Sequence, residues 1–189
     1  MKTESARVFF ALWPDDDCAD QLHRVANSLA AGWGGRVMKR STLHLTLAFV
    51  GDVREDRLAE LLSLAGEARI AVNSIEPAPL ELNRLGYWRH NHILWAGTDR
   101  VPGMLEALAD RLTGELSARG YSVPVQAFSP HVTLIRKLDV PPETSSLDAL
   151  KCSPVRWLYR DFVLLRSHRS RVGADYEILG TWSLGRTSR

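Results

Sequence analysis

The sequence contains little cysteine and no long apolar run, and each shortage excludes a class of protein. Its two cysteines, Cys18 and Cys152, are far apart and form no CxxC pair, so we expect reduced thiols rather than a disulfide framework or a cysteine-based zinc site. The apolar stretch at residues 8–13 is too short to span a bilayer, and "PDDD" follows it in place of a small-residue cleavage site. The sequence therefore predicts a cytoplasmic protein without a membrane span.

The sequence also lacks a strong charge imbalance and any linker-like segment. Its formal net charge is +2, which permits a polyanionic ligand but does not require one. The 189 residues are enough for one good-sized domain, and no Pro/Ser-rich or low-complexity tract divides them. We therefore expect a single domain over residues 1–189, and nothing in the composition requires a protein partner, so we expect a monomer.

Helical and strand patterns alternate along the chain. Apolar residues at helical spacing predict helices at residues 15–30, 54–69 and 102–119. Runs of β-forming residues predict strands at 6–13, 36–39, 43–50, 80–88, 92–98, 131–138, 155–170 (as one long or two short strands) and 175–184. The order favours an α+β fold with largely antiparallel sheets lining a central cleft and helices on the outside.

A short motif occurs twice, each time in an expected strand. "HLTL" at residues 44–47 recurs 87 residues later as "HVTL" at residues 131–134, which is close to half the chain length. This spacing suggests two similar lobes related by an approximate two-fold axis. Because side chains alternate along a strand, His44 shares a face with Thr46, and His131 shares a face with Thr133. The two histidine-bearing faces would then meet across the cleft.

Two opposed imidazoles suit the cleavage of a phosphodiester. A single HxT motif is most often structural, but histidine titrates near neutral pH, so one imidazole of a pair can act as base while the other acts as acid. Threonine hydroxyls can donate to phosphate oxygens, and Arg136 can offset the developing charge. Strict alternation places Arg136 on the face opposite His131, so it must reach from the strand end or be turned by a β-bulge.

Paired HxT[L/V/I] motifs resemble those of the two-histidine (2H) phosphoesterase superfamily. Within it, the chain is similar to the bacterial RNA 2′,3′-cyclic phosphodiesterases, historically named 2′-5′ RNA ligases. The resemblance covers nearly the whole chain and is carried by "RVFFALWPDDD", "STLHLTLAFVGDV", "HILWAGT", "FSPHVTLIRK" and "DFVLLRSHRSRVGADYEILGTWSL".

The resemblance implies hydrolysis of a terminal 2′,3′-cyclic phosphate to a 2′-phosphate, without a metal or other cofactor. It makes His44 the proton donor and His131 the proton acceptor, and it assigns phosphate binding to Thr46, Thr133 and Arg136. The family often has a basic residue immediately before "PH", where this sequence has Ser129.

Other interpretations of the same motifs stay open. The substrate could instead be a small cyclic nucleotide or an ADP-ribose cyclic phosphate, the reaction could run in reverse as 2′-5′ ligation, or the chain could be an RNA-binding module without activity. The pair His90 and His92 has zinc-like spacing but no third ligand nearby, so we expect a solvated hairpin.

Two further groups of residues have an RNA-binding interpretation beside an ordinary one. A C-terminal group of arginines is either a solvated strand edge or a path for an RNA end. Four aromatic residues are candidates to stack on a base, although most aromatics in a protein of this size are core: Phe9, Phe49, Tyr87 and Trp88.

Overall fold

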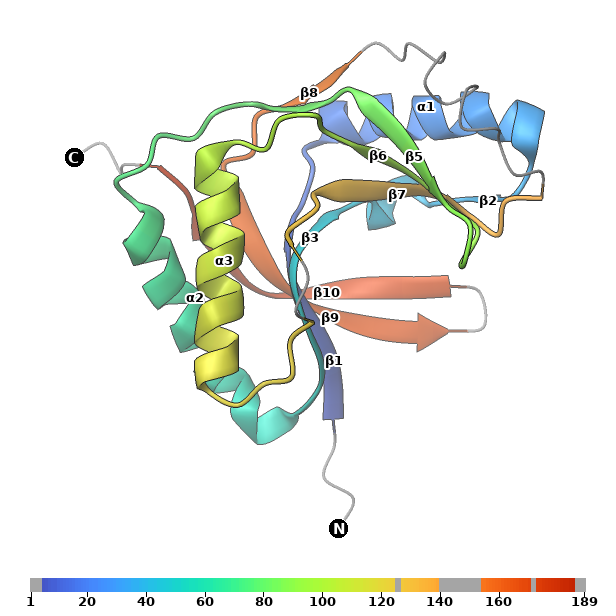
Figure 1. The fold of residues 1–189 in the computed structure, drawn as a ribbon. Coiled ribbons are helices and arrows are strands. Elements are labelled where there is room, and N and C mark those ends of the chain that lie inside the picture. The colour runs from blue at the N-terminus through green and yellow to red at the C-terminus, as the bar shows by residue number, and fades with distance from the viewer. Residues whose placement is uncertain (1–4, 125–126, 140–153, 171–172, 186–189) are drawn as a thin grey trace.

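The computed structural model describes residues 5–124, 127–139, 154–170 and 173–185. In this part, eight strands form one sheet in the order β10-β9-β1-β3-β7-β6-β5, with β2 beside β7 (Figure 1). Every strand pair in it is antiparallel, which confirms the predicted α+β class. The strands are β1 Ser5–Leu12, β2 Arg36–Val37, β3 Leu45–Arg54, β5 Arg84–Trp88, β6 Ile93–Gly97, β7 His131–Arg136, β9 Asp161–Ser170 and β10 Gly173–Ser183.

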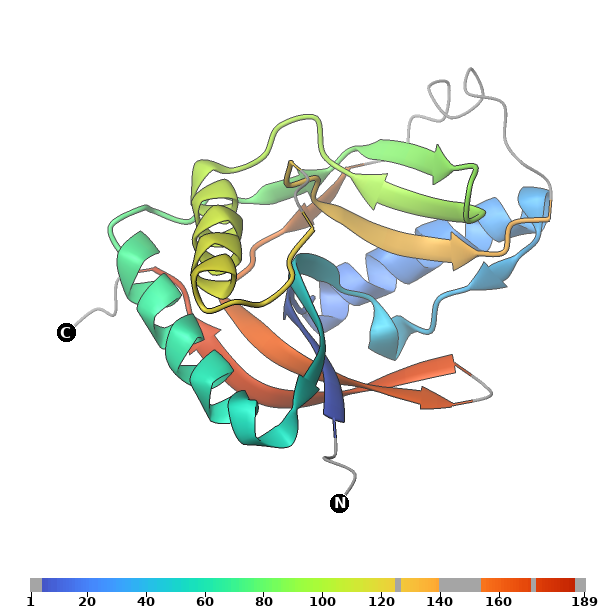
Figure 2. The same cartoon turned by 60° about the horizontal axis from the view of Figure 1, so that its bottom comes forward.

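The sheet consists of two halves that meet where β3 lies beside β7. One half is β3-β1-β9-β10 and the other is β7-β6-β5 with β2 (Figure 2). Leu45 on β3 pairs with Val132 on β7, and these residues are themselves 87 positions apart. A pair of repeat-equivalent residues that face each other marks the approximate two-fold axis that the motif spacing suggested.

In the described part of the chain, three α-helices cover the outside of the sheet. Helix α1 (Asp16–Trp33) packs on β2 and β7, whereas α3 (Gly103–Ala118) packs on β3 and on α2 (Leu58–Val72). Each long helix preceding an HxT motif therefore covers the half that carries the other motif. Helix α1 begins where the sequence predicted, because the Asp15 carboxylate accepts a hydrogen bond from the Cys18 N–H. None of the helices in the described ranges is long and apolar enough to cross a bilayer.

The predicted hairpin at residues 80–98 differs from the observed structure. Residues 80–82 form a separate strand, β4 (Leu80–Leu82), which pairs with β8 (Val155–Trp157) in a second, two-stranded sheet, while only β5 and β6 form the hairpin. Leu80, Leu82, Val155 and Trp157 are all buried, so this small sheet forms because it adds apolar surface to the core. The long pattern at 155–170 is accordingly two strands, β8 and β9.

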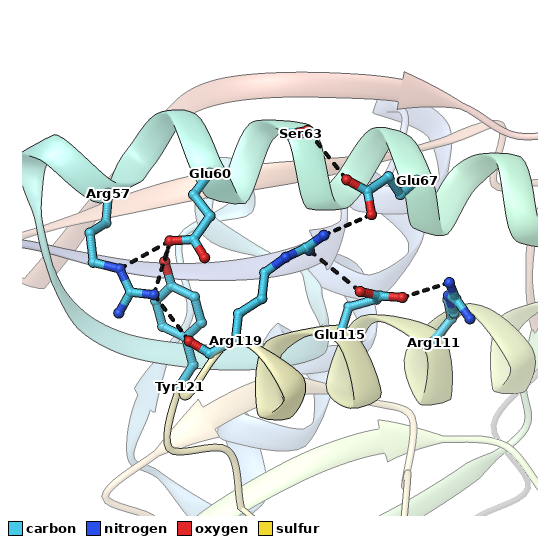
Figure 3. A network of polar contacts seen from close by, with 8 residues as sticks. All are labelled: Arg57, Glu60, Ser63, Glu67, Arg111, Glu115, Arg119 and Tyr121. Carbon is cyan, nitrogen blue, oxygen red and sulfur yellow. Dashed lines mark hydrogen bonds and ion pairs between the residues drawn. The ribbon is translucent and has the colours of Figure 1, made fainter.

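A polar network joins α2 to the C-terminal end of α3 (Figure 3). The Tyr121 hydroxyl donates to the Glu60 carboxylate at 3.0 Å, and the Arg57 guanidinium lies over the Tyr121 ring, 4.0 Å from its centroid. Arg119 pairs with Glu67 on α2 at 2.7 Å. These contacts hold in place the end of α3, from which the chain runs toward β7 and the second HxT motif.

Replacing Tyr121 with Phe tests this network. The change removes the hydroxyl that donates to Glu60 but keeps the ring beneath Arg57, and Tyr121 is only 8% exposed. We expect the free energy of unfolding to fall by about 1.5–3 kcal/mol, the range for a hydrogen bond to a charged group, with catalytic activity retained. Urea denaturation measures the change. As a matched control, Ser63→Ala removes an exposed bond of the same network to Glu67 and should alter stability by less than about 0.5 kcal/mol; equal effects of the two variants would contradict the account.

Candidate active site

The two HxT motifs lie beside each other on β3 and β7. The pairing of Leu45 with Val132 is antiparallel, so each histidine lies opposite the threonine of the other motif, with all four side chains on the same face. All four are partly exposed, whereas Leu45 and Val132 between them are completely buried. The structure therefore brings together the two motifs that the sequence places half a chain apart.

The first histidine, predicted to lie within a strand, lies one residue before the observed strand. Strand β3 begins at Leu45, so His44 precedes it by one residue and follows a short 3₁₀ turn, Arg40–Thr42. The prediction of a strand from residue 43 was wrong by two residues because this turn takes up the residues before His44.

Both imidazoles are held by the same local hydrogen bond. The Nδ1 atom of His44 lies 2.8 Å from the carbonyl oxygen of Thr42, and the Nδ1 atom of His131 lies 2.8 Å from the carbonyl oxygen of Ser129. A carbonyl only accepts, so each Nδ1 carries the hydrogen and each Nε2 is left to take up or release a proton. This contact uses the backbone of Ser129, so it does not depend on the basic side chain that the family often has there.

Aromatic rings surround the His44 imidazole. The Phe9 ring centroid lies 5.0 Å away, the Tyr176 ring meets the imidazole edge-on at 5.1 Å, and the Trp13 ring is stacked nearly parallel at 6.2 Å. Sequence analysis named Phe9 but missed Trp13 and Tyr176. The alternation of β1 carries the signal for Trp13, since Phe9 and Trp13 are four residues apart and share a face. No local pattern indicates Tyr176, which reaches the site from β10.

A second aromatic wall stands beside His131. The Trp88 ring meets the imidazole edge-on at 4.6 Å, and the Trp95 ring centroid lies at 6.2 Å. The Trp95 ring lies flat on the sheet because Gly86 and Gly97 have no side chain, and a Cβ at Gly86 would come within 2.0 Å of the ring. Any residue other than glycine at position 86 would displace the ring from this wall.

The surroundings lower the pKa of both histidines. Burial lowers the pKa of His44 to about 4, against the opposing effect of its hydrogen bond to the Thr42 carbonyl, and the nearby charges of Arg136 and His131 lower it further. Burial also lowers the pKa of His131, and Arg136 again adds to the effect. Both rings are therefore neutral near pH 7 when the site holds no anion.

A β-bulge brings Arg136 to the same face as His131. The two β6 residues that pair with Thr133 and Ile135 are consecutive in the chain. Leu134, between them on β7, therefore has no partner on β6 and is the extra residue of a bulge. Leu134 and Ile135 are consecutive and both completely buried, and the next residue, Arg136, is partly exposed as His131 and Thr133 are. The bulge is one of the two ways in which the sequence analysis allowed Arg136 to reach the site.

The same bulge occurs at the equivalent place in β3. The two β1 residues that pair with Thr46 and Ala48 are consecutive, so Leu47 is the extra residue on β3. It lies 87 positions before Leu134. The repeat therefore includes the bulge as well as the HxT motif. The counterpart of Arg136 is Phe49, whose ring is 37% exposed. The two lobes thus differ at this position, where one presents a cation and the other an aromatic ring.

The zinc-like histidine pair is part of a hairpin turn. The Nδ1 atom of His92 lies 3.1 Å from the Tyr87 hydroxyl, and His90 is exposed. Among the residues the structure describes, no group of three or more His, Cys, Asp or Glu side chains is placed to hold a metal ion. Cys18 is a buried free thiol, and Cys152 lies outside the described residues.

Of the C-terminal arginines, Arg166 is held in ion pairs. Arg166 pairs with Glu55 at 2.7 Å and lies 3.7 Å from Glu177, so its charge is offset locally. The side chain of Arg169 and all of Arg171 lie outside the described part of the chain.

Removing the Arg136 charge should raise the pKa of both histidines. The guanidinium disfavours the protonated imidazole, so Arg136→Gln makes protonation easier, moves the pKa of His44 upward from about 4 and also raises the pKa of His131. Nitrogen-15 NMR of the imidazole rings across a pH titration measures both values. Arg54→Gln, at the far end of β3 and paired with Asp56, should change neither. Unchanged histidine pKa values in Arg136→Gln would mean that Arg136 points away from the site, as strict alternation requires.

Comparison with known proteins agrees with this geometry. Residues 12–95 match the family described as LigT like Phosphoesterase. The RNA 2′,3′-cyclic phosphodiesterase of Escherichia coli (strain K12) is 28% identical over 185 residues, covering 96% of this chain and 98% of that protein. The protein of the same name from Aeropyrum pernix is 32% identical over 120 residues, covering 61% and 65% of the two chains.

The fold is also similar to that of solved structures. The crystal structure of E. coli LigT complexed with 3′-AMP superimposes with a TM-score of 0.80 at 27% identity and covers 96% of this chain and 99% of that one. Together with the paired HxT motifs on adjacent strands, these matches show that the chain is similar in sequence and in fold to LigT-like phosphoesterases.

Proposed function

We propose that the protein hydrolyses RNA 2′,3′-cyclic phosphodiester ends to 2′-phosphomonoesters by paired-histidine acid–base catalysis. One observation carries the proposal: two imidazoles on adjacent strands are each held through Nδ1 by a backbone carbonyl, which leaves both Nε2 atoms for proton transfer. The relatives named RNA 2′,3′-cyclic phosphodiesterase support the substrate class.

The different environments of the histidines support distinct roles. In the proposed reaction, His131 takes a proton from the attacking water while the water oxygen bonds to phosphorus. His44 gives its proton to the 3′ oxygen as the P–O3′ bond breaks, which leaves the phosphate on O2′. The strongly lowered pKa of His44 makes its protonated form a good acid, whereas His131, on the more open side, is the better base.

Binding of the phosphodiester anion favours the uptake of a proton from solvent by His44. The free site disfavours a second positive charge near Arg136, but a bound anion reverses that effect and favours one imidazolium. Arg136, Thr46 and Thr133 would contact the non-bridging oxygens, and the charge of Arg136 would stabilise the additional negative charge of the transition state. No metal or other cofactor takes part in this scheme.

Two other substrates and one reverse reaction use the same core. A small cyclic nucleotide or an ADP-ribose cyclic phosphate would fit the same proton transfers. In 2′-5′ ligation an RNA 5′-hydroxyl attacks the cyclic phosphate in place of water, in a reversible transesterification, and it competes with water at about 55 M unless the site holds the hydroxyl in place with a high effective molarity. A non-catalytic RNA-binding module is the alternative of a different class. We further propose that the chain acts in the cytoplasm as a monomer.

Two substrates distinguish these possibilities when both are assayed with EDTA present. We expect a short RNA ending in a 2′,3′-cyclic phosphate to give a 2′-phosphate, and His44→Ala and His131→Ala each to lower kcat by about 10²–10⁴. His168→Ala is the matched control, since His168 is exposed, pairs with Glu177 and should leave kcat unchanged.

Several results would contradict the proposal. Full activity in either active-site variant, loss of activity with EDTA, or a 3′-phosphate product would each exclude the mechanism. Turnover of a 2′,3′-cyclic mononucleotide without turnover of the RNA would move the function to small nucleotides. Binding of the RNA without turnover would favour the binding module.

A further inference from the structure

A buried apolar cluster lies next to the active site, on β1, β9 and β10. These strands place a small group of side chains on the cleft face, where they form a hydrophobic cluster separate from the main core. The register pairs Ala11 with Val163 and Val163 with Thr181, so this row begins next to Thr46 and runs to the edge strand. The cluster consists of Phe9, Ala11, Val163 and Leu165, with Trp13 and Tyr176 packed against it.

A pocket opens at the Trp13 end of this cluster. Its volume is about 330 Å³, and its lining includes Trp13, Leu158, Asp161 and Ile178. Leu158 and Ile178 are each 52% exposed, which is high for large aliphatic side chains on the edge of a cleft. Trp13 lines this pocket and its ring is also stacked on the His44 imidazole, so the pocket lies next to the active site.

The polar groups of the pocket favour a base over a phosphate. Asp15 and Asp161 contribute two carboxylates and Arg160 a single guanidinium, so a phosphate would meet net negative charge. Asp15 is occupied as the cap of α1, whereas the side chain of Asp161 has no hydrogen-bond or ion-pair partner among the described residues. Partial burial raises the pKa of Asp161. Such an acceptor, beside apolar walls, matches the exocyclic amino group of a nucleobase.

We infer that this pocket binds the base of the penultimate nucleotide of the RNA, and that Asp161 favours bases with an exocyclic amino group over uracil. The inference rests on the proposed function. The base of the terminal nucleotide must stay close to the histidines that act on its own ribose, so a base beyond the Trp13 ring belongs to the preceding nucleotide. Flat apolar contact with Trp13 and Ile178 would supply affinity, as aromatic and apolar side chains do in single-strand binding.

Substrates of one and two nucleotides test the inference. For the wild-type protein we expect kcat/KM for a dinucleotide, cytidylyl-adenosine 2′,3′-cyclic phosphate, to exceed that for adenosine 2′,3′-cyclic phosphate roughly tenfold, toward the low end of what one stacked base contributes. The uridylyl dinucleotide should be several-fold poorer than the cytidylyl one. Ile178→Ser should remove most of the dinucleotide advantage. Asp161→Asn, whose amide also donates, should abolish the preference for cytidine over uridine.

The mononucleotide serves as the internal control for folding and chemistry. Both variants should hydrolyse it as the wild type does, and Ile70→Ser, at an isoleucine 69% exposed on α2, should leave every rate unchanged. Equal wild-type rates on one and two nucleotides would overturn the inference while leaving the proposed function intact. A loss in Ile178→Ser that is the same for both substrates would overturn it too. Absence of turnover on every substrate would instead remove the proposed function, and this inference with it.

Discussion

The antiparallel pairing of Leu45 with Val132 is the contact on which the site depends. These two residues are equivalent in the repeat and lie on the approximate two-fold axis, so their pairing alone sets each histidine opposite the threonine of the other motif. Both are completely buried, as expected of a junction between two halves of one sheet. A shift of one residue in this register would turn one HxT face into the core and leave the other histidine without a counterpart.

A second constraint comes from the bulges at Leu47 and Leu134. Each turns its strand so that the third residue after the threonine returns to the cleft face, which delivers Arg136 from one lobe and Phe49 from the other. The repeat is thus symmetric in backbone and asymmetric in side chains. Aromatic rings on both sides bury the imidazoles and lower their pKa values. Both imidazoles are therefore neutral until a bound anion favours the protonated form. This arrangement suits a reaction on an anion, because the empty site disfavours the protonated imidazole that a bound phosphodiester stabilises.

Much of this could be predicted from the sequence, and the failures have physical causes. The main helices follow from local periodicity, and the two-lobed α+β fold follows from the order of the elements and from the 87-residue spacing of the HxT repeat. The position of Arg136 was left between two possibilities, because a bulge depends on strand pairing and leaves no mark in alternation. Tyr176 was missed for a similar reason, since only the packing of β10 brings it to His44. The separation of β4 from β5 required knowledge of β8, which lies more than 70 residues away in the chain.

The most direct test of this account is a crystal structure of the protein with adenosine 2′-monophosphate, the smallest product of the proposed reaction. The account predicts that the phosphate lies between the two imidazoles, with both Nε2 atoms within about 2.6–3.2 Å of its oxygens and the Arg136 guanidinium on the same side. A phosphate held by only one histidine, or bound on another face of the sheet, would contradict the claim that the β3–β7 junction assembles one site from the two motifs.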